Sequence, residues 1–99
     1  MTYTPNWQDD NTDLLVKALL TLKNEDDAYR LLEDLCTISE IKAMAQRIQV
    51  AYQLSQDITY NTIVQNTGAS TATISRVKRC LNYGADGYKR VLKKIGEET

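Results

Sequence analysis

The chain has 99 residues with two cysteines, one proline and no histidine, and 12 Lys/Arg against 13 Asp/Glu give a formal net charge of −1. Cys36 and Cys80 lie far apart without a CxxC spacing, which argues against a disulfide framework or a zinc site and predicts reduced, packed thiols. No apolar run approaches the ~20 residues of a membrane span, and the amino terminus lacks a secretory signal pattern. We therefore expect a small cytoplasmic protein with no cofactor, no metal and no membrane partner.

Residues 1–12 contain Pro5 and little periodicity, so they are predicted to form a flexible arm in which Tyr3 and Trp7 dock locally. Residues 13–99 are predicted to form one all-α domain. The first helix, 13–23, carries aliphatic residues around most of its circumference, so it must be buried on more than one side. A second copy of the chain is the simplest cover and favours a homodimer; a central helix of a monomeric bundle is the alternative. These aliphatic residues are Leu14, Leu15, Val16, Ala18, Leu19, Leu20 and Leu22.

Two helix starts are marked by capping residues. Asn24 precedes three carboxylates, which suit the positive end of a helix dipole better than a metal site, and this helix extends to about Leu35. Thr37 and Glu40 form a capping box that opens a long helix to about Gln56. We expect the second helix to bury Ala28, Leu31, Leu32 and Leu35, and the long helix to bury Ile41, Met44, Ala45, Ile48, Ala51, Tyr52 and Ser55.

Residues 60–81 have the spacing of a helix-turn-helix, with Thr59 as the cap of its first helix. Gly68 stands where that helix must stop and the chain reverse, a position that favours a positive φ. Ser70 or Thr71 then caps the second helix. The apolar stripe that follows, which packs against the protein, consists of Ile74, Val77 and Leu81.

The opposite side of the second helix carries Ala72, Ser75, Arg76 and Arg79. Small side chains let a helix approach base edges, and arginine reaches guanine or phosphate oxygens, so this pattern indicates DNA binding. An ordinary pair of antiparallel helices with a glycine turn is the alternative.

The charge distribution favours DNA binding. Residues 1–58 hold five Lys/Arg against ten Asp/Glu, a net of −5, whereas residues 59–96 hold seven against one, a net of +6. After a loop at 82–87, a last helix at 88–95 is expected to bury Val91, Leu92 and Ile95 and to expose Lys89, Arg90, Lys93 and Lys94. The basic half coincides with the predicted DNA-reading element, although a merely solvated basic surface is the alternative.

Two sequence motifs resemble those of a known protein family. Gly-Ala-x-x-Ala-Thr-Ile-Ser-Arg at residues 68–76 and Ala-x-x-x-Arg-Ile at residues 43–48 resemble the Trp repressor superfamily, specifically its small Trp-repressor-related proteins of low-GC Gram-positive bacteria. The resemblance covers residues 37–95. It implies an all-α, six-helix bundle, an intertwined homodimer, and one helix-turn-helix per subunit in successive major grooves of a palindromic operator.

The resemblance also implies an effector site. In the family two arginines enclose the ligand's indole, and Arg47 and Arg76 occupy their positions, while Thr37 matches a residue that binds the ligand's amino group through its backbone. Neighbouring positions depart from the family pattern at Asp34, Val77 and Cys80, and Val77 stands where a flat ligand would enter. We therefore expect an anionic or aromatic effector other than tryptophan, or arginines that pair with carboxylates such as Asp34.

For DNA, the family uses the start of the second helix together with phosphate contacts. Val64 replaces a basic residue usual on the first helix, so phosphate contacts are expected to shift to Lys78 and Arg79. The predicted DNA-binding residues are Asn61, Ser70, Thr71, Ala72, Ser75, Lys78, Arg79 and Asn82.

The leading hypothesis is a sequence-specific, homodimeric transcriptional regulator that represses by occlusion. An enzyme is disfavoured, because the chain has no histidine, no activated nucleophile and no glycine-rich phosphate loop. A protein-interaction module that has lost DNA binding is the remaining alternative, suggested by the overall acidity and by Val64.

Overall fold

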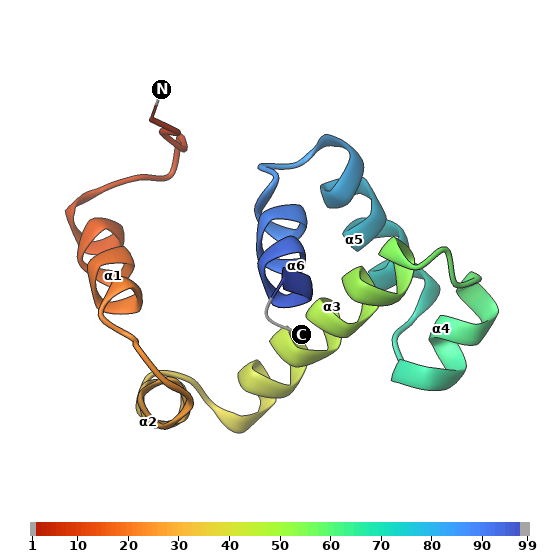
Figure 1. The fold of residues 1–99 in the computed structure, drawn as a ribbon, viewed down its shortest axis with the longest axis horizontal. Coiled ribbons are helices and arrows are strands. Elements are labelled where there is room, and N and C mark those ends of the chain that lie inside the picture. Colours follow the sequence, from red (N-terminus) through yellow and green to blue (C-terminus); the bar gives the residue numbers. More distant parts are fainter. Residues whose placement is uncertain (1, 98–99) are drawn as a thin grey trace. The chain divides into compact units, whose positions relative to one another are not determined.

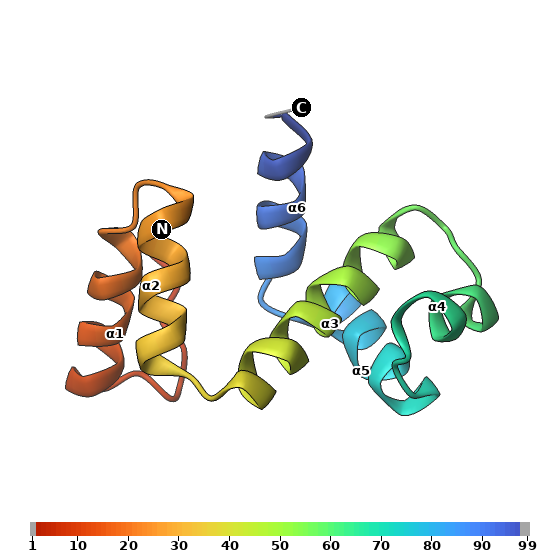
Figure 2. The ribbon, with the colours of Figure 1, turned by 90° about the horizontal axis from the view of Figure 1, so that it is seen from below.

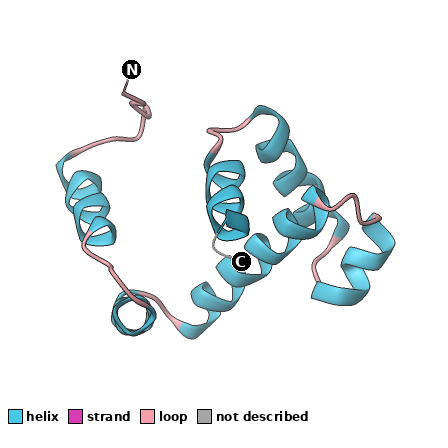
Figure 3. Ribbon diagram, viewed as in Figure 1, coloured by secondary structure: helices cyan, strands magenta, loops and turns pink. Residues whose placement is uncertain are grey.

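The computed structural model describes residues 2–97, which form six α-helices and contain no strand (Figures 1 and 3). The chain divides into two compact units, residues 1–36 and 37–99. The first contains α1 and α2, and the second contains α3 to α6. The helices are α1 Asp10–Leu20, α2 Glu25–Leu35, α3 Ile38–Ser55, α4 Tyr60–Thr67, α5 Thr71–Tyr83 and α6 Gly87–Glu97. The all-α prediction is confirmed.

The first helix starts earlier than predicted. Asp9 accepts a hydrogen bond from the Thr12 backbone N–H at 2.8 Å, and the Thr12 hydroxyl accepts one from the Asp9 N–H at 2.8 Å. This capping box starts α1 at Asp10, three residues before the expected position 13. The arm before it is tied to α1 by the Gln8 side-chain amide, which donates to the Asp13 carboxylate at 2.7 Å. A single domain over residues 13–99 stays a prediction.

The amino-terminal unit has no fully buried residue in either helix. Leu14 is 68% exposed and Leu20 is 79% exposed on α1, and the cover predicted for this helix stays a prediction. On α2 the predicted cap is confirmed, because the Asn24 side chain accepts from the Asp27 N–H at 2.9 Å. The predicted burial of Leu35 is wrong within one chain, since this side chain is 54% exposed.

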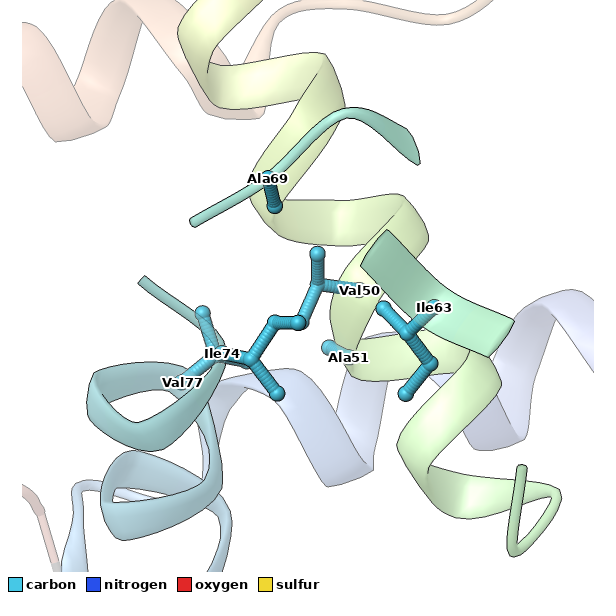
Figure 4. Close-up of a cluster of buried hydrophobic side chains, with 6 residues drawn as sticks. All are labelled: Val50, Ala51, Ile63, Ala69, Ile74 and Val77. Atoms are coloured by element: carbon cyan, nitrogen blue, oxygen red, sulfur yellow. The ribbon is translucent and has the colours of Figure 1, made fainter. Parts of the chain in front are cut away.

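The core of the chain lies in the second unit, where α4, α5 and the turn between them pack against α3 (Figure 4). It is formed by Val50 and Ala51 of α3, Ile63 of α4, Ala69 of the turn, and Ile74 and Val77 of α5. Fully burying one Ile or Val side chain contributes about 1.5–3 kcal/mol, so this small cluster fixes the mutual position of three helices. Leu54, Val64, Leu81 and Leu92 pack around it, partly exposed.

The inner side of α3 differs from the prediction. Val50, Ala51 and Gln53 are buried, whereas Ile48 is 40% exposed and Tyr52 is 48% exposed. Two apolar stripes share this helix, and α4 and α5 pack against the stripe that contains Val50 and Leu54. Of the predicted inner residues, Ala51 is confirmed as buried and two are half-buried, but the predicted burial of the other four is wrong within one chain. The half-buried residues are Ile41 and Met44, and the exposed ones are Ala45, Ile48, Tyr52 and Ser55.

The last two helices are longer than predicted. Helix α5 continues to Tyr83 and α6 starts at Gly87, so the loop shrinks to residues 84–86. On α6, Tyr88 and Leu92 pack against the core, but Val91 and Ile95 are 47% and 49% exposed, and their expected burial is wrong within one chain. None of the helices within residues 2–97 has the length and apolarity that a membrane span requires.

Candidate nucleic-acid interface

The turn between α4 and α5 has the predicted conformation. Gly68 ends α4 with φ 71°, in the left-handed region, and its N–H donates to the Val64 carbonyl at 2.9 Å. The next residue, Ala69, is only 2% exposed, and its N–H donates to the Thr67 hydroxyl at 3.1 Å. Three residues, 68–70, therefore connect α4 to α5, and the predicted helix-turn-helix is confirmed as a structure (Figure 2).

Two glutamines hold this motif on α3. The Gln46 amide donates to the Thr67 carbonyl at 3.1 Å, and the buried Gln53 accepts from the Asn66 amide at 3.0 Å. These bonds satisfy polar groups at the end of α4, where helix carbonyls lack partners. The sequence analysis did not include either glutamine; the available signal was their position four residues before and three residues after Val50, which places them on the same side of α3.

The second helix of the motif is capped by Ser70, one of the two predicted candidates. Its hydroxyl accepts from the Thr73 N–H at 3.1 Å and donates to the Thr73 hydroxyl at 3.1 Å. Both hydrogen-bonding roles of Ser70 are thus used inside the protein. Thr71, the first residue of α5, is exposed and makes no side-chain hydrogen bond within residues 2–97.

One side of α5 packs inward and the other is open. Ile74 and Val77 are buried and Leu81 is half-buried, whereas Ala72, Ser75 and Arg79 are exposed. The open side therefore offers a methyl group, a hydroxyl and a guanidinium along successive turns. All the residues predicted to contact DNA are exposed, namely Asn61, Ser70, Thr71, Ala72, Ser75, Lys78, Arg79 and Asn82.

Lys78 differs from the other predicted DNA contacts. Its ammonium nitrogen lies 5.6 Å from the centroid of the Tyr60 ring, at the beginning of α4. Arg79 makes no ion pair within residues 2–97. The two neighbouring cations of α5 therefore have different surroundings.

The two candidate effector arginines lie on one cavity. Arg47 of α3 and Arg76 of α5 line a hollow of about 370 Å³, and neither guanidinium forms an ion pair or a hydrogen bond within residues 2–97. Arg47 and Arg76 thus lie on the same cavity, and their role in binding an effector stays a prediction; Gln46, Thr73 and Tyr88, which the sequence did not single out, line the same walls. Tyr88 could have been found from its place on the apolar side of α6.

Thr37 does not line this cavity. Its hydroxyl accepts from the Glu40 N–H at 3.1 Å, and its N–H donates to the Glu40 carboxylate at 2.8 Å, so it caps α3. The hydrogen bonds from the Thr37 backbone and hydroxyl hold the pKa of Glu40 below its ordinary value. At 1.5 Å per residue, Thr37 lies about 15 Å from Arg47 along the helix axis.

The residues that depart from the family pattern have distinct places. Val77 lines the arginine cavity and is buried at 2% exposure, so its side chain occupies space between α3 and α5. Asp34 belongs to the amino-terminal unit, and its pairing with either arginine stays a prediction. Both thiols are free, but Cys80 is exposed and Cys36 is half-buried, so the expectation of packed thiols is wrong for Cys80.

Comparisons with known proteins all point to one family. The family model described as Trp repressor protein matches residues 10–96. The uncharacterized protein YerC of Bacillus subtilis (strain 168) is 53% identical over 85 residues, which cover 86% of this chain and 82% of YerC.

Two crystal structures are similar throughout. A candidate Trp repressor from Staphylococcus aureus matches with a TM-score of 0.86 and 47% sequence identity. The match covers 90% of this chain and 89% of the S. aureus chain. A TrpR-like protein from Eubacterium eligens ATCC 27750 has a TM-score of 0.86 at 50% identity, covering 90% and 92%. The chain therefore belongs to the Trp repressor protein family and is, at the level of that family, a DNA-binding regulator.

Proposed function

We propose that the protein is a sequence-specific transcriptional repressor that acts as a homodimer in the cytoplasm and occludes its operator. The observation that carries this proposal is the open side of α5, which presents Ala72, Ser75 and Arg79 directly after the Gly68 turn. A helix of this kind enters the major groove with its amino-terminal half, because small side chains there let the backbone approach the base edges.

Each part of the surface has a distinct role in this proposal. Thr71, Ala72 and Ser75 read base edges, and Arg79 binds guanine or a phosphate oxygen. Asn61 and Lys78 bind phosphates on one flank, and Asn82 does so near the end of α5. Ser70 fixes the start of α5 through its cap and reaches DNA only by its backbone. The net charge of +6 over residues 59–96 supports phosphate binding.

The uncovered apolar side chains support a homodimer. Leu14 and Leu20 of α1, and Ile48 and Tyr52 of α3, are exposed in one chain. A second copy covers such surfaces by symmetry, in the way obligate homodimers bury them. It also supplies a second α5, and the two reading helices then match a palindromic operator with half-sites about 34 Å apart.

A small anionic effector is part of this proposal. Arg47 and Arg76 lie on one cavity without carboxylate partners in the described chain, an arrangement that suits a carboxylate or phosphate group. Val77 fills space between the same helices, which disfavours a flat indole and therefore tryptophan. Because α5 carries both Arg76 and the DNA-reading side, a ligand here would change the position of that helix. Thr37 joins the cavity only if a second chain brings it there.

A protein-interaction module is the second candidate function. The observation that favours it is Val64, which is half-buried against the core where the family usually has a cation on the first helix. Without that cation the motif depends on fewer phosphate contacts.

Selection of bound sequences from a random DNA pool tests the proposal, with and without a metabolite extract. We expect a palindromic consensus, bound with an affinity that falls smoothly from low to physiological salt. Supplying the extract should change the affinity in the parent and not in the Arg47→Gln variant. Failure to bind any DNA, even at low salt, would reject the regulator and favour the interaction module.

A further inference from the structure

Lys78 is directed toward the first helix of the motif rather than along the open side of α5. Its ammonium lies over the face of the Tyr60 ring, 5.6 Å from the centroid, and it makes no ion pair within residues 2–97. Lys78 and Tyr60 line a second cavity of about 370 Å³, which shares no residue with the arginine cavity. Asp57 also lines this second cavity, yet the aromatic ring is the partner that contacts the ammonium. A cation over a tyrosine face is attracted by the negative potential of the ring.

The two residues differ in mobility. Tyr60 is half-buried, opens α4 after the Thr59 cap, and packs against the core cluster, so its ring is fixed by the same contacts that hold the helix-turn-helix together. Lys78 is exposed and has a flexible four-carbon chain, which would otherwise sample many rotamers. The ring thus selects the rotamers that keep the ammonium beside the start of α4.

This placement explains how the motif contacts a phosphate without a cation on α4. Val64 supplies no charge there, but Lys78 reaches across from α5 and brings one to the α4 end that also carries the exposed Asn61. The ring covers only one side of the ammonium, so N–H groups directed away from it stay able to donate. A phosphate oxygen can therefore bind Lys78 while Tyr60 still holds it.

We infer that Tyr60 is a positioning residue, which acts through Lys78 to place a phosphate contact at the start of α4. The inference rests on the proposed DNA-binding function and adds a residue that none of the predicted contacts included. It also assigns the two cations of α5 to different tasks, with Lys78 on the phosphate backbone and Arg79 on the open side of the helix.

The test is a double-mutant cycle on the full-length protein, with DNA affinity measured over a range of salt concentrations on the selected operator. Tyr60→Leu removes the ring and Tyr60→Phe keeps it, while Lys78→Gln removes the charge from an exposed position. We expect Tyr60→Leu to weaken binding about two- to fivefold, the range that an exposed cation–π contact supports, and Tyr60→Phe to match the parent. Lys78→Gln should lower the slope of log affinity against log salt by about 1.

The cycle separates positioning from folding. In the Lys78→Gln background, Tyr60→Leu should have no further effect on affinity, because the group it positions is gone. An equal loss in both backgrounds, or parental affinity of Tyr60→Leu, would overturn the inference. An unchanged salt slope in Lys78→Gln would also overturn it. Because Lys78 is exposed, this second measurement holds even if Tyr60→Leu does not fold. A parent that binds no DNA would instead reject the proposed function itself.

Discussion

The two compact units of this chain use their apolar residues in opposite ways. In residues 37–99, α3, α4 and α5 share a core whose members are almost completely inaccessible, such as Ile63 and Ile74 at 0% exposure. In residues 1–36, neither helix has a fully buried residue, and Leu20 is 79% exposed. Residues 37–99 therefore contain a core of their own, whereas the two helices of residues 1–36 leave most of their apolar side chains exposed.

The two units also carry opposite net charges. Residues 1–36 hold three Lys/Arg against eight Asp/Glu, a net of −5, whereas residues 37–99 hold nine against five, a net of +4. The basic unit is also the one that contains the helix-turn-helix. In the proposed function the basic unit therefore carries the DNA-binding surface, whereas the exposed apolar residues of α1, together with those of α3, form the contact with a second copy.

The largest effect is expected in the core of the basic unit. Ile74→Ala removes a completely buried side chain and should lower the free energy of unfolding by about 2–5 kcal/mol. Tyr83→Ala on the same helix, where the side chain is 86% exposed, should change it by no more than about 0.5 kcal/mol. Denaturant unfolding followed by helical circular dichroism measures both. Equal effects of the two variants would contradict the core described here.

A substitution in the amino-terminal unit should weaken the proposed dimer. Leu20→Ala removes an exposed apolar side chain that a second copy is proposed to cover, so the dimer dissociation constant should rise by about tenfold or more. Lys17→Ala, on the same helix, serves as the control and should leave it unchanged. Sedimentation equilibrium over a dilution series gives both constants. A parent that sediments as a monomer at every concentration would contradict the division of tasks between the units.

The glycine turn should show a smaller effect that is purely conformational. A methyl group at Gly68 meets nothing within 4 Å, so Gly68→Ala is opposed only by the positive φ, at about 1–2 kcal/mol of stability. Gly87→Ala also meets nothing within 4 Å and lies outside the left-handed region, so it should be neutral or slightly stabilising. Thermal unfolding of the two variants compares them, and a neutral Gly68→Ala would show that the turn does not require this conformation.

The smallest effect concerns pH. Hydrogen bonds from Thr37 lower the pKa of Glu40 in the folded protein, so its contribution to stability is present above the ordinary pKa and is lost as pH falls through the folded value. Glu40→Gln should therefore be less stable than the parent at pH 7 and equal to it in strong acid. Denaturant midpoints at a series of pH values measure this difference. A difference that persists unchanged in acid would contradict the assigned cause.

Local signals made much of the fold predictable. The caps at Asn24, Thr37 and Thr59 and the turn at Gly68 depend on residues within one helical turn, and the structure has each of them. The inner side of α3 was not predictable in the same way. Two apolar stripes run along that helix, and the sequence does not distinguish the stripe that meets its own chain from the one left for another surface.

In the candidate site, too, features within one helix were predictable and contacts between helices were not. The outward position of Ala72, Ser75 and Arg79 follows from helix periodicity alone. The glutamine anchors and the contact between Lys78 and Tyr60 depend on how α3, α4 and α5 cross, which periodicity does not specify. Cys80 was expected in the interior but is exposed, because it lies to one side of the apolar stripe of α5 formed by Ile74, Val77 and Leu81.

The most direct measurement of the central claim is the affinity of Arg79→Ala for the selected operator, compared with Arg30→Ala. Both variants remove one exposed guanidinium, but Arg30 lies in the acidic unit, paired with Asp26 at 2.7 Å. We expect Arg79→Ala to weaken binding by about 1–3 kcal/mol if it reads a base, or equally across sequences if it meets only phosphate, and Arg30→Ala to bind as the parent does. Parental affinity of Arg79→Ala would contradict the assignment of DNA recognition to the open side of α5.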